Sequence, residues 1–154
     1  MKQYLIDTFK FNDRANITII AKIFEMPSPD KAINLFSHLI YSQNKWMARV
    51  LNDPNEQNLE WFGKPISVNE LATNWDKSIS NWINYLEKLN EDKLTTEIRY
   101  VSSEGRKLGV LLKDIALQLN YHSIHHRAQI CMMLREQNID VPFIEYIGGV
   151  VKRY

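Results

Sequence analysis

The sequence is poor in the residues that cross-link, kink or interrupt a chain. Its 154 residues include one cysteine, five prolines and five glycines. A single cysteine excludes a disulfide within the chain and any zinc site built from several cysteines. It also fits a reducing compartment.

The sequence also has no large excess of positive or negative charge and no long apolar run. Nineteen Lys and Arg against eighteen Asp and Glu leave a formal net charge of +1, which argues against nucleic-acid binding. No apolar stretch approaches the ~18 residues of a membrane span. The N-terminal residues lack the apolar core of a signal peptide. We therefore expect a cytoplasmic protein, and the length suits a single domain over residues 1–154.

The scarcity of proline and glycine leaves four long uninterrupted windows. They span residues 1–26, 30–53, 66–104 and 110–141. Proline breaks helix interiors, and apolar residues recur in these windows at helical spacing, so each window predicts an amphipathic helix. Four such helices indicate an all-α, antiparallel four-helix bundle. Trp46, Trp75 and Trp82 lie on the apolar stripes and are expected in the core.

Local signals mark the ends of these helices. Ser28 is expected to cap the second helix, and Ser67 with Glu70 has the spacing of a capping box for the third. Residues 95–108 combine a β-prone run with a turn, which predicts a small hairpin before the last long helix. That helix is expected over about residues 110–137.

Three of the four histidines cluster within residues 121–127. At about 100° per residue, His122 and His126 project onto the apolar face of the fourth helix, and His125 onto its polar border. Cys131 projects to about the opposite side from His122. Two histidines at i and i+4 can share a metal ion, and they can equally be satisfied by hydrogen bonds in a core. Ser123 follows His122 where a zincin motif has Glu.

Two further residues are placed less clearly by periodicity. His38 shares its helix face with polar residues such as Lys45 and Arg49, so its projection predicts a surface position. Arg127 projects about 100° away from His126, so direct contact with a metal ion is not expected. An acidic partner on a neighbouring helix or across an interface is expected for Arg127.

Several motifs together resemble the DinB-like family of metal-binding four-helix bundles. The first helix carries Phe-Asn-Asp-Arg-Ala-Asn at 11–16, the second His38-Leu39 followed by Trp46 and Arg49. The fourth carries Asn-Tyr-His-Ser-Ile-His-His-Arg-Ala-Gln at 120–129, and the end of the chain Pro142 and Glu-Tyr-Ile at 145–147. The departures are Ala128 and Asn138 in place of Gly, and Glu145 in place of Asp.

This resemblance implies a metal site made of His38, His122 and His126, including the histidine that periodicity places at the surface. Three imidazoles suit Zn²⁺ or Ni²⁺ and leave coordination positions open. The candidates to lie beside these ligands or in the pocket are Asn16, Gln118, His125 and Gln129. The alternative for each is an ordinary position on a helix surface or in side-chain packing.

The resemblance leaves three functions open. They are a metal-dependent hydrolase, a metal-assisted thiol S-transferase acting on a small-molecule or thiol substrate, and a non-catalytic, stress-related binding bundle. It also implies a homodimer, for which Trp61, Phe62 and Phe143 are candidate exposed aromatic residues.

Overall fold

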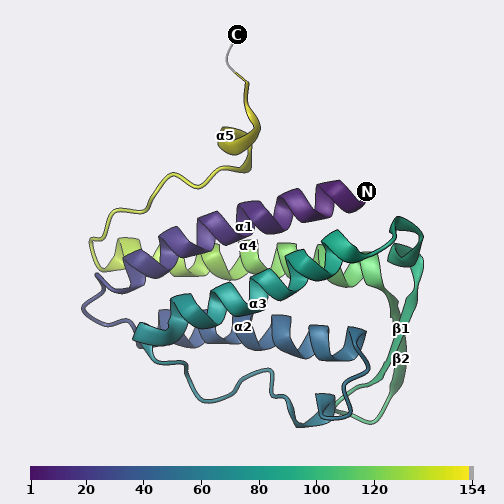
Figure 1. Ribbon diagram of the computed structural model, residues 1–154. Coiled ribbons are helices and arrows are strands. Elements are labelled where there is room, and N and C mark those ends of the chain that lie inside the picture. The colour runs from purple at the N-terminus through teal and green to yellow at the C-terminus, as the bar shows by residue number, and fades with distance from the viewer. Residues whose placement is uncertain (153–154) are drawn as a thin grey trace.

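The computed structural model describes residues 1–152 and confirms four long helices with a small hairpin before the last (Figure 1). The long helices are α1 (Lys2–Ile23), α2 (Asp30–Val50), α3 (Val68–Lys88) and α4 (Leu112–Glu136). The hairpin consists of β1 (Glu97–Val101) and β2 (Lys107–Leu111), and short helices η1 (Glu56–Asn58), η2 (Glu91–Thr95) and α5 (Tyr146–Val150) complete the chain.

The helix ends differ from the expectation in three details. The last long helix begins at Leu112 rather than near Val110, because residues 107–111 pair with β1 in an antiparallel ladder. Ser67 is the residue that precedes α3, but its side chain makes no capping bond, and Pro29 rather than Ser28 precedes α2. The backbone amide of Ser28 instead donates to the side chain of Gln137, at the end of α4.

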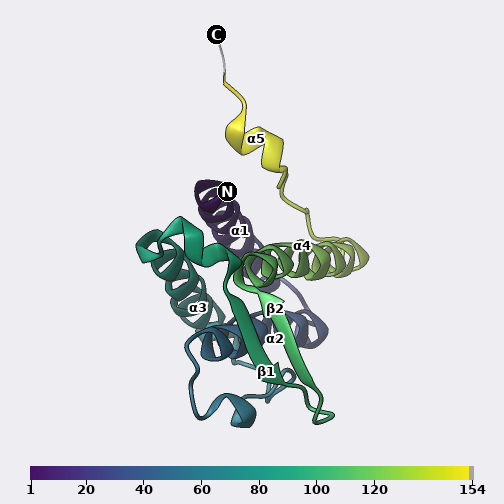
Figure 2. The ribbon, with the colours of Figure 1, turned by 90° about the vertical axis from the view of Figure 1, so that its right-hand side faces the viewer.

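Each long helix packs against two others. Helix α1 contacts α3 and α4, and α2 contacts the same two helices, so α1 and α2 lie diagonally across the bundle (Figure 2). The paired side chains Asn12–Asn120 and Asn16–Ser123 show that α1 and α4 run in the same direction, so the expected antiparallel arrangement does not hold for this neighbouring pair. The reason is the long connection over residues 51–67, which returns the chain to the starting end of α2 before α3 begins (Figure 1).

The core contains the large apolar side chains that helical periodicity selected. Trp75 and Trp82 are fully buried, and Phe36 and Phe9 pack against them respectively. Trp46 is only half-buried and contacts Trp61 and Tyr100 at the hairpin end of α2. Burying one such aromatic ring stabilises a fold by a few kcal/mol, so these rings hold α1, α2 and α3 together.

The last residues of the described chain leave the bundle. Helix α5 lies outside the four long helices, next to α1, where Tyr146 meets Phe11 edge to face (Figures 1 and 2). Phe143 and Phe62 are strongly exposed, as expected, whereas Trp61 is half-buried. Among residues 1–152, no helix combines the length and hydropathy needed to cross a bilayer.

Candidate metal centre

Three histidines from two helices converge between α2 and α4. His38 comes from α2, and His122 and His126 come from adjacent turns of α4. The Nε2 atom of His122 lies 3.1 Å from Nε2 of His38 and 2.9 Å from Nε2 of His126. One ring nitrogen of each residue therefore faces a common point, and the three form a cluster that could hold a metal ion.

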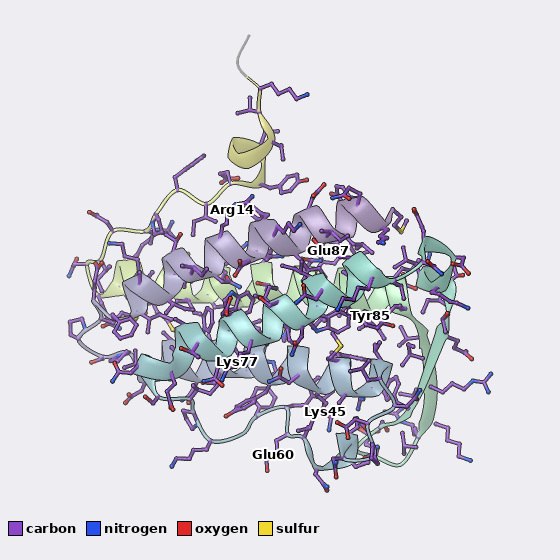
Figure 3. The ribbon with its side chains drawn as sticks, in the orientation of Figure 1. Arg14, Lys45, Glu60, Lys77, Tyr85 and Glu87 are labelled. Carbon is purple, nitrogen blue, oxygen red and sulfur yellow. The ribbon has the colours of Figure 1, made fainter. Side chains whose placement is uncertain are left out.

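The surface position predicted for His38 from periodicity is wrong, since its side chain is only 7% exposed. Lys45 and Arg49, on the same side of α2, are buried as well. The connection that follows α2 folds back over this polar face and covers it. Figure 3 shows Lys45 on the side of α2 that faces this connection, with Glu60 on the connection itself.

Buried charges and hydrogen bonds fasten this connection, residues 51–67, to α2. The Arg49 guanidinium donates to Glu56 across 2.7 Å, and the Lys45 ammonium donates to the backbone carbonyls of Glu56 and Leu59. Farther along, the amide of Ile66 donates to the Ser37 hydroxyl. The backbone between these anchors is thereby positioned beside His38.

The outer nitrogens of two histidines are held by hydrogen bonds. Nδ1 of His38 donates to the carbonyl oxygen of Trp61 across 2.7 Å, and Nδ1 of His126 donates to Oε1 of Gln129 across 2.6 Å. Because a carbonyl oxygen only accepts, each Nδ1 carries the hydrogen and each Nε2 keeps its lone pair. This is the tautomer with which imidazole binds a metal ion through Nε2.

The convergence of these lone pairs fits a bound cation. A hydrogen on Nε2 of His122 can be donated to only one of its two neighbours at a time. The other short contact would then place an Nε2 lone pair against the His122 nitrogen without a hydrogen between them. A divalent metal ion among the three Nε2 atoms removes this repulsion, so the residues present suit such an ion.

Burial keeps the cluster in the neutral form that binds metal. The pKa of His122 falls to about 4, mainly because burial penalises the imidazolium and secondarily because His126, His38 and His125 lie near. Burial also lowers the pKa of His126, against the opposing effect of its hydrogen bond to Gln129. Near pH 7 protons therefore compete weakly with a metal ion for these two rings.

Aromatic rings flank the cluster. Phe62 stacks flat on His38, with ring centroids 4.0 Å apart and planes 2° from parallel, yet the residue is 75% exposed. His125 is exposed and meets His126 edge-on at 5.0 Å between centroids. Phe62 thus shields one face of the His38 ring from water while its own outer face stays accessible.

The other residues expected beside the ligands lie in different places. Gln129 contacts His126 directly, whereas Gln118 is exposed on α4. The amide of Asn16 is directed away from the rings, because its nitrogen donates to Ser123 and its oxygen accepts from Arg127. Asn16 therefore joins α1 to α4 rather than orienting a histidine.

Arg127 also differs from its expectation. It is buried and donates to the side-chain oxygens of Asn12 and Asn16, so two amides take the place of the expected acidic partner. Burial lowers its pKa to about 10. This polar network was missed by periodicity, although the polar residues Asn12 and Asn16 on the apolar stripe of the first helix were a visible signal for it. The network fixes α4, and with it His122 and His126, against α1.

Replacing Gln129 by alanine is expected to weaken metal binding without abolishing it. The three ligands stay, but His126 loses the acceptor that fixes its tautomer and orientation, and such partners are typically worth about 10- to 100-fold in metal affinity. Competition with a chromogenic chelator measures the change. Gln129→Glu, which keeps an acceptor oxygen, should restore most of the affinity, and equal losses in both variants would contradict this role.

Comparison with known families finds a match over most of the chain. The model of the DinB superfamily matches residues 29–130, a segment that includes His38, His122 and His126. No curated protein and no solved structure matches the chain. The matched segment runs from the start of α2 well into α4 and covers most of the chain. The protein belongs to the DinB superfamily.

Proposed function

We propose that this protein binds one divalent metal ion through Nε2 of His38, His122 and His126 and acts as a metal-dependent enzyme of the hydrolase type. The observation that carries the proposal is the meeting of three Nε2 atoms, two of them with their tautomer held by a hydrogen bond on Nδ1. Imidazole donors suit Zn²⁺ or Ni²⁺. Three protein ligands leave coordination positions for water or substrate, as in catalytic rather than structural sites.

The chain's own groups would orient the site and limit its contact with water. A bound ion supplies Lewis-acid activation of a water molecule or a substrate group. The carbonyl of Trp61 and the amide of Gln129 hold the rings of His38 and His126 in the ligating orientation. Phe62 covers one face of the His38 ring and limits the access of water to it.

The single cysteine lies outside the proposed metal site. Cys131 is half-buried, and five residues after His126 its side chain leaves α4 at about 140° to that histidine. Burial raises the pKa of its thiol, which keeps the reactive thiolate scarce at neutral pH. If the metal site instead activates a thiol, as in the S-transferase alternative, that thiol comes from the substrate.

Cys131→Ala is therefore expected to leave metal content and metal affinity unchanged. The wild-type thiol should also react with a disulfide reagent at pH 8 more slowly than a free thiol in solution, because of its raised pKa. Loss of metal from Cys131→Ala would contradict the placement of this residue outside the site.

Elemental analysis of protein purified without chelators tests the metal site directly, with one equivalent of metal per chain expected. Turnover is then sought in a hydrolase panel and a thiol-conjugation panel, each with and without chelator. Metal-dependent hydrolysis supports the proposal, and turnover confined to the thiol panel replaces the hydrolase assignment by the transferase. Bound metal without turnover in either panel favours a non-catalytic binding bundle, and absence of metal contradicts all three.

A further inference from the structure

A groove of about 480 Å³ lies in the same seam between α2 and α4 as the three histidines. Its α2 wall includes Leu35 and Lys31, three and seven residues before His38. Its α4 wall begins at Gln129, three residues after His126. Helical rise places Leu35 and Lys31 about 4 to 10 Å, and Gln129 to Glu136 about 4 to 15 Å, along the helices from the nearest ligand, so the groove begins next to the metal site.

Gln129 is shared between the two features. Its side-chain oxygen accepts from Nδ1 of His126, and the same residue lines the groove. A molecule lying in the groove therefore borders the residue that orients one of the ligands. Gln129 distinguishes this groove from the hollows at the hairpin and beside α5, none of which it lines.

The walls of the groove are mainly apolar and flexible. Leu35 and Met133 are half-buried against the core, and Met132 is 59% exposed. Methionine side chains adapt to ligands of irregular shape and contact aliphatic or sulfur-containing groups well. The far end carries one charge of each sign, Lys31 and Glu136, so the groove does not select its ligand by net charge.

We propose that this groove holds the non-reacting part of the substrate, and that the substrate is a small amphiphilic molecule. Its polar reacting group lies at the three histidines, and an aliphatic or thioether chain extends from it along Leu35, Met132 and Met133. This inference rests on the proposed function, because it assumes a metal ion at the histidines.

A series of straight-chain hydroxamic acids tests the groove. The hydroxamate binds the open positions of the metal ion, and its alkyl tail is lengthened from one carbon to seven. For the protein loaded with Co²⁺ or Zn²⁺, affinity is expected to rise about two- to fourfold per added methylene, until the tail fills the groove. Calorimetry or the visible spectrum of the Co²⁺ form measures each dissociation constant.

Two variants locate the effect. Met132→Glu places a carboxylate beside the tail at an exposed position, and Leu35→Trp fills the groove; both should flatten the dependence on chain length while the affinity for acetohydroxamate stays. Ile17→Glu is the matched control, since Ile17 is an exposed apolar helix residue on α1, outside the groove. It should keep the wild-type dependence.

The outcomes separate the two proposals. If acetohydroxamate binds but longer tails add nothing, or if Met132→Glu keeps the full dependence, the groove is not the substrate site and the metal site stands. If the metal, or acetohydroxamate on the metal-loaded protein, fails to bind, the proposed function is wrong and the groove assignment fails with it.

Discussion

Substitution of His122 by alanine is expected to lower the affinity for Zn²⁺ by at least about 100-fold, more than the loss typical of a partner outside the ligand set. His122 lies between the other two ligands, with Nε2 about 3 Å from Nε2 of both. Without His122, only His38 on α2 and His126 on α4 remain as ligands, and the imidazole that lies between them is missing. Competition titration with a chromogenic chelator measures the loss, and elemental analysis of the purified variant should find little metal.

His125→Ala is the matched control for this experiment. His125 lies on the same helix and has the same chemistry, but it is exposed and only its ring edge touches His126. Its removal should leave affinity unchanged. His38→Ala and His126→Ala should resemble His122→Ala. Equal affinity in the His122 and His125 variants would show that the cluster is not the metal site.

Glu56→Ala is expected to be the most destabilising of the charge substitutions, with a loss of about 3–5 kcal/mol in the free energy of unfolding. The Glu56 carboxylate lies 2.7 Å from Arg49 and 3.5 Å from Lys45, and all three side chains are at least nine-tenths buried. Removing the carboxylate leaves two buried cations without an anion. The rings of Tyr100, Trp46 and Trp61 around Arg49 stabilise its charge but do not neutralise it.

Urea unfolding followed by circular dichroism measures this loss as a shift of the midpoint at constant slope. Glu87→Ala serves as the control, because its ion pair with Lys10 has a similar distance of 2.8 Å, with side chains 43% and 45% exposed. A loss below about 1 kcal/mol is expected there. Similar losses in both variants would mean that the buried cluster does not hold the connection to α2.

Glu56→Ala should also weaken metal binding. The connection that Glu56 anchors carries the Trp61 carbonyl, which accepts from Nδ1 of His38, and Phe62, which stacks on the same ring. Loosening it frees His38 to change tautomer and orientation. A destabilised variant that still folds in buffer should therefore show reduced affinity for Zn²⁺, whereas Glu87→Ala should not.

The sequence alone determined the helices, the hairpin, the buried tryptophans of the third helix, and the placing of His122 and His126 on one face of the fourth. These features are local: proline and glycine limit where helices can run, and a spacing of four residues brings two side chains together on any helix. The match to the DinB superfamily over residues 29–130 agrees with the resemblance seen in its motifs.

Only the tertiary structure decided the environment of His38. Hydrophobic periodicity reports which side of a helix is apolar, and it assumes that the polar side meets water. Here the polar side of α2 is covered by the chain's own backbone, which bonds to Lys45 and His38, and by Glu56, which pairs with Arg49. Polar groups can be buried when they have polar partners. Here those partners lie in the connection over residues 51–67, and hydrophobic periodicity does not predict the path of that connection. For the same reason Asn16 and Arg127, assigned other roles from the sequence, proved to bind each other across α1 and α4.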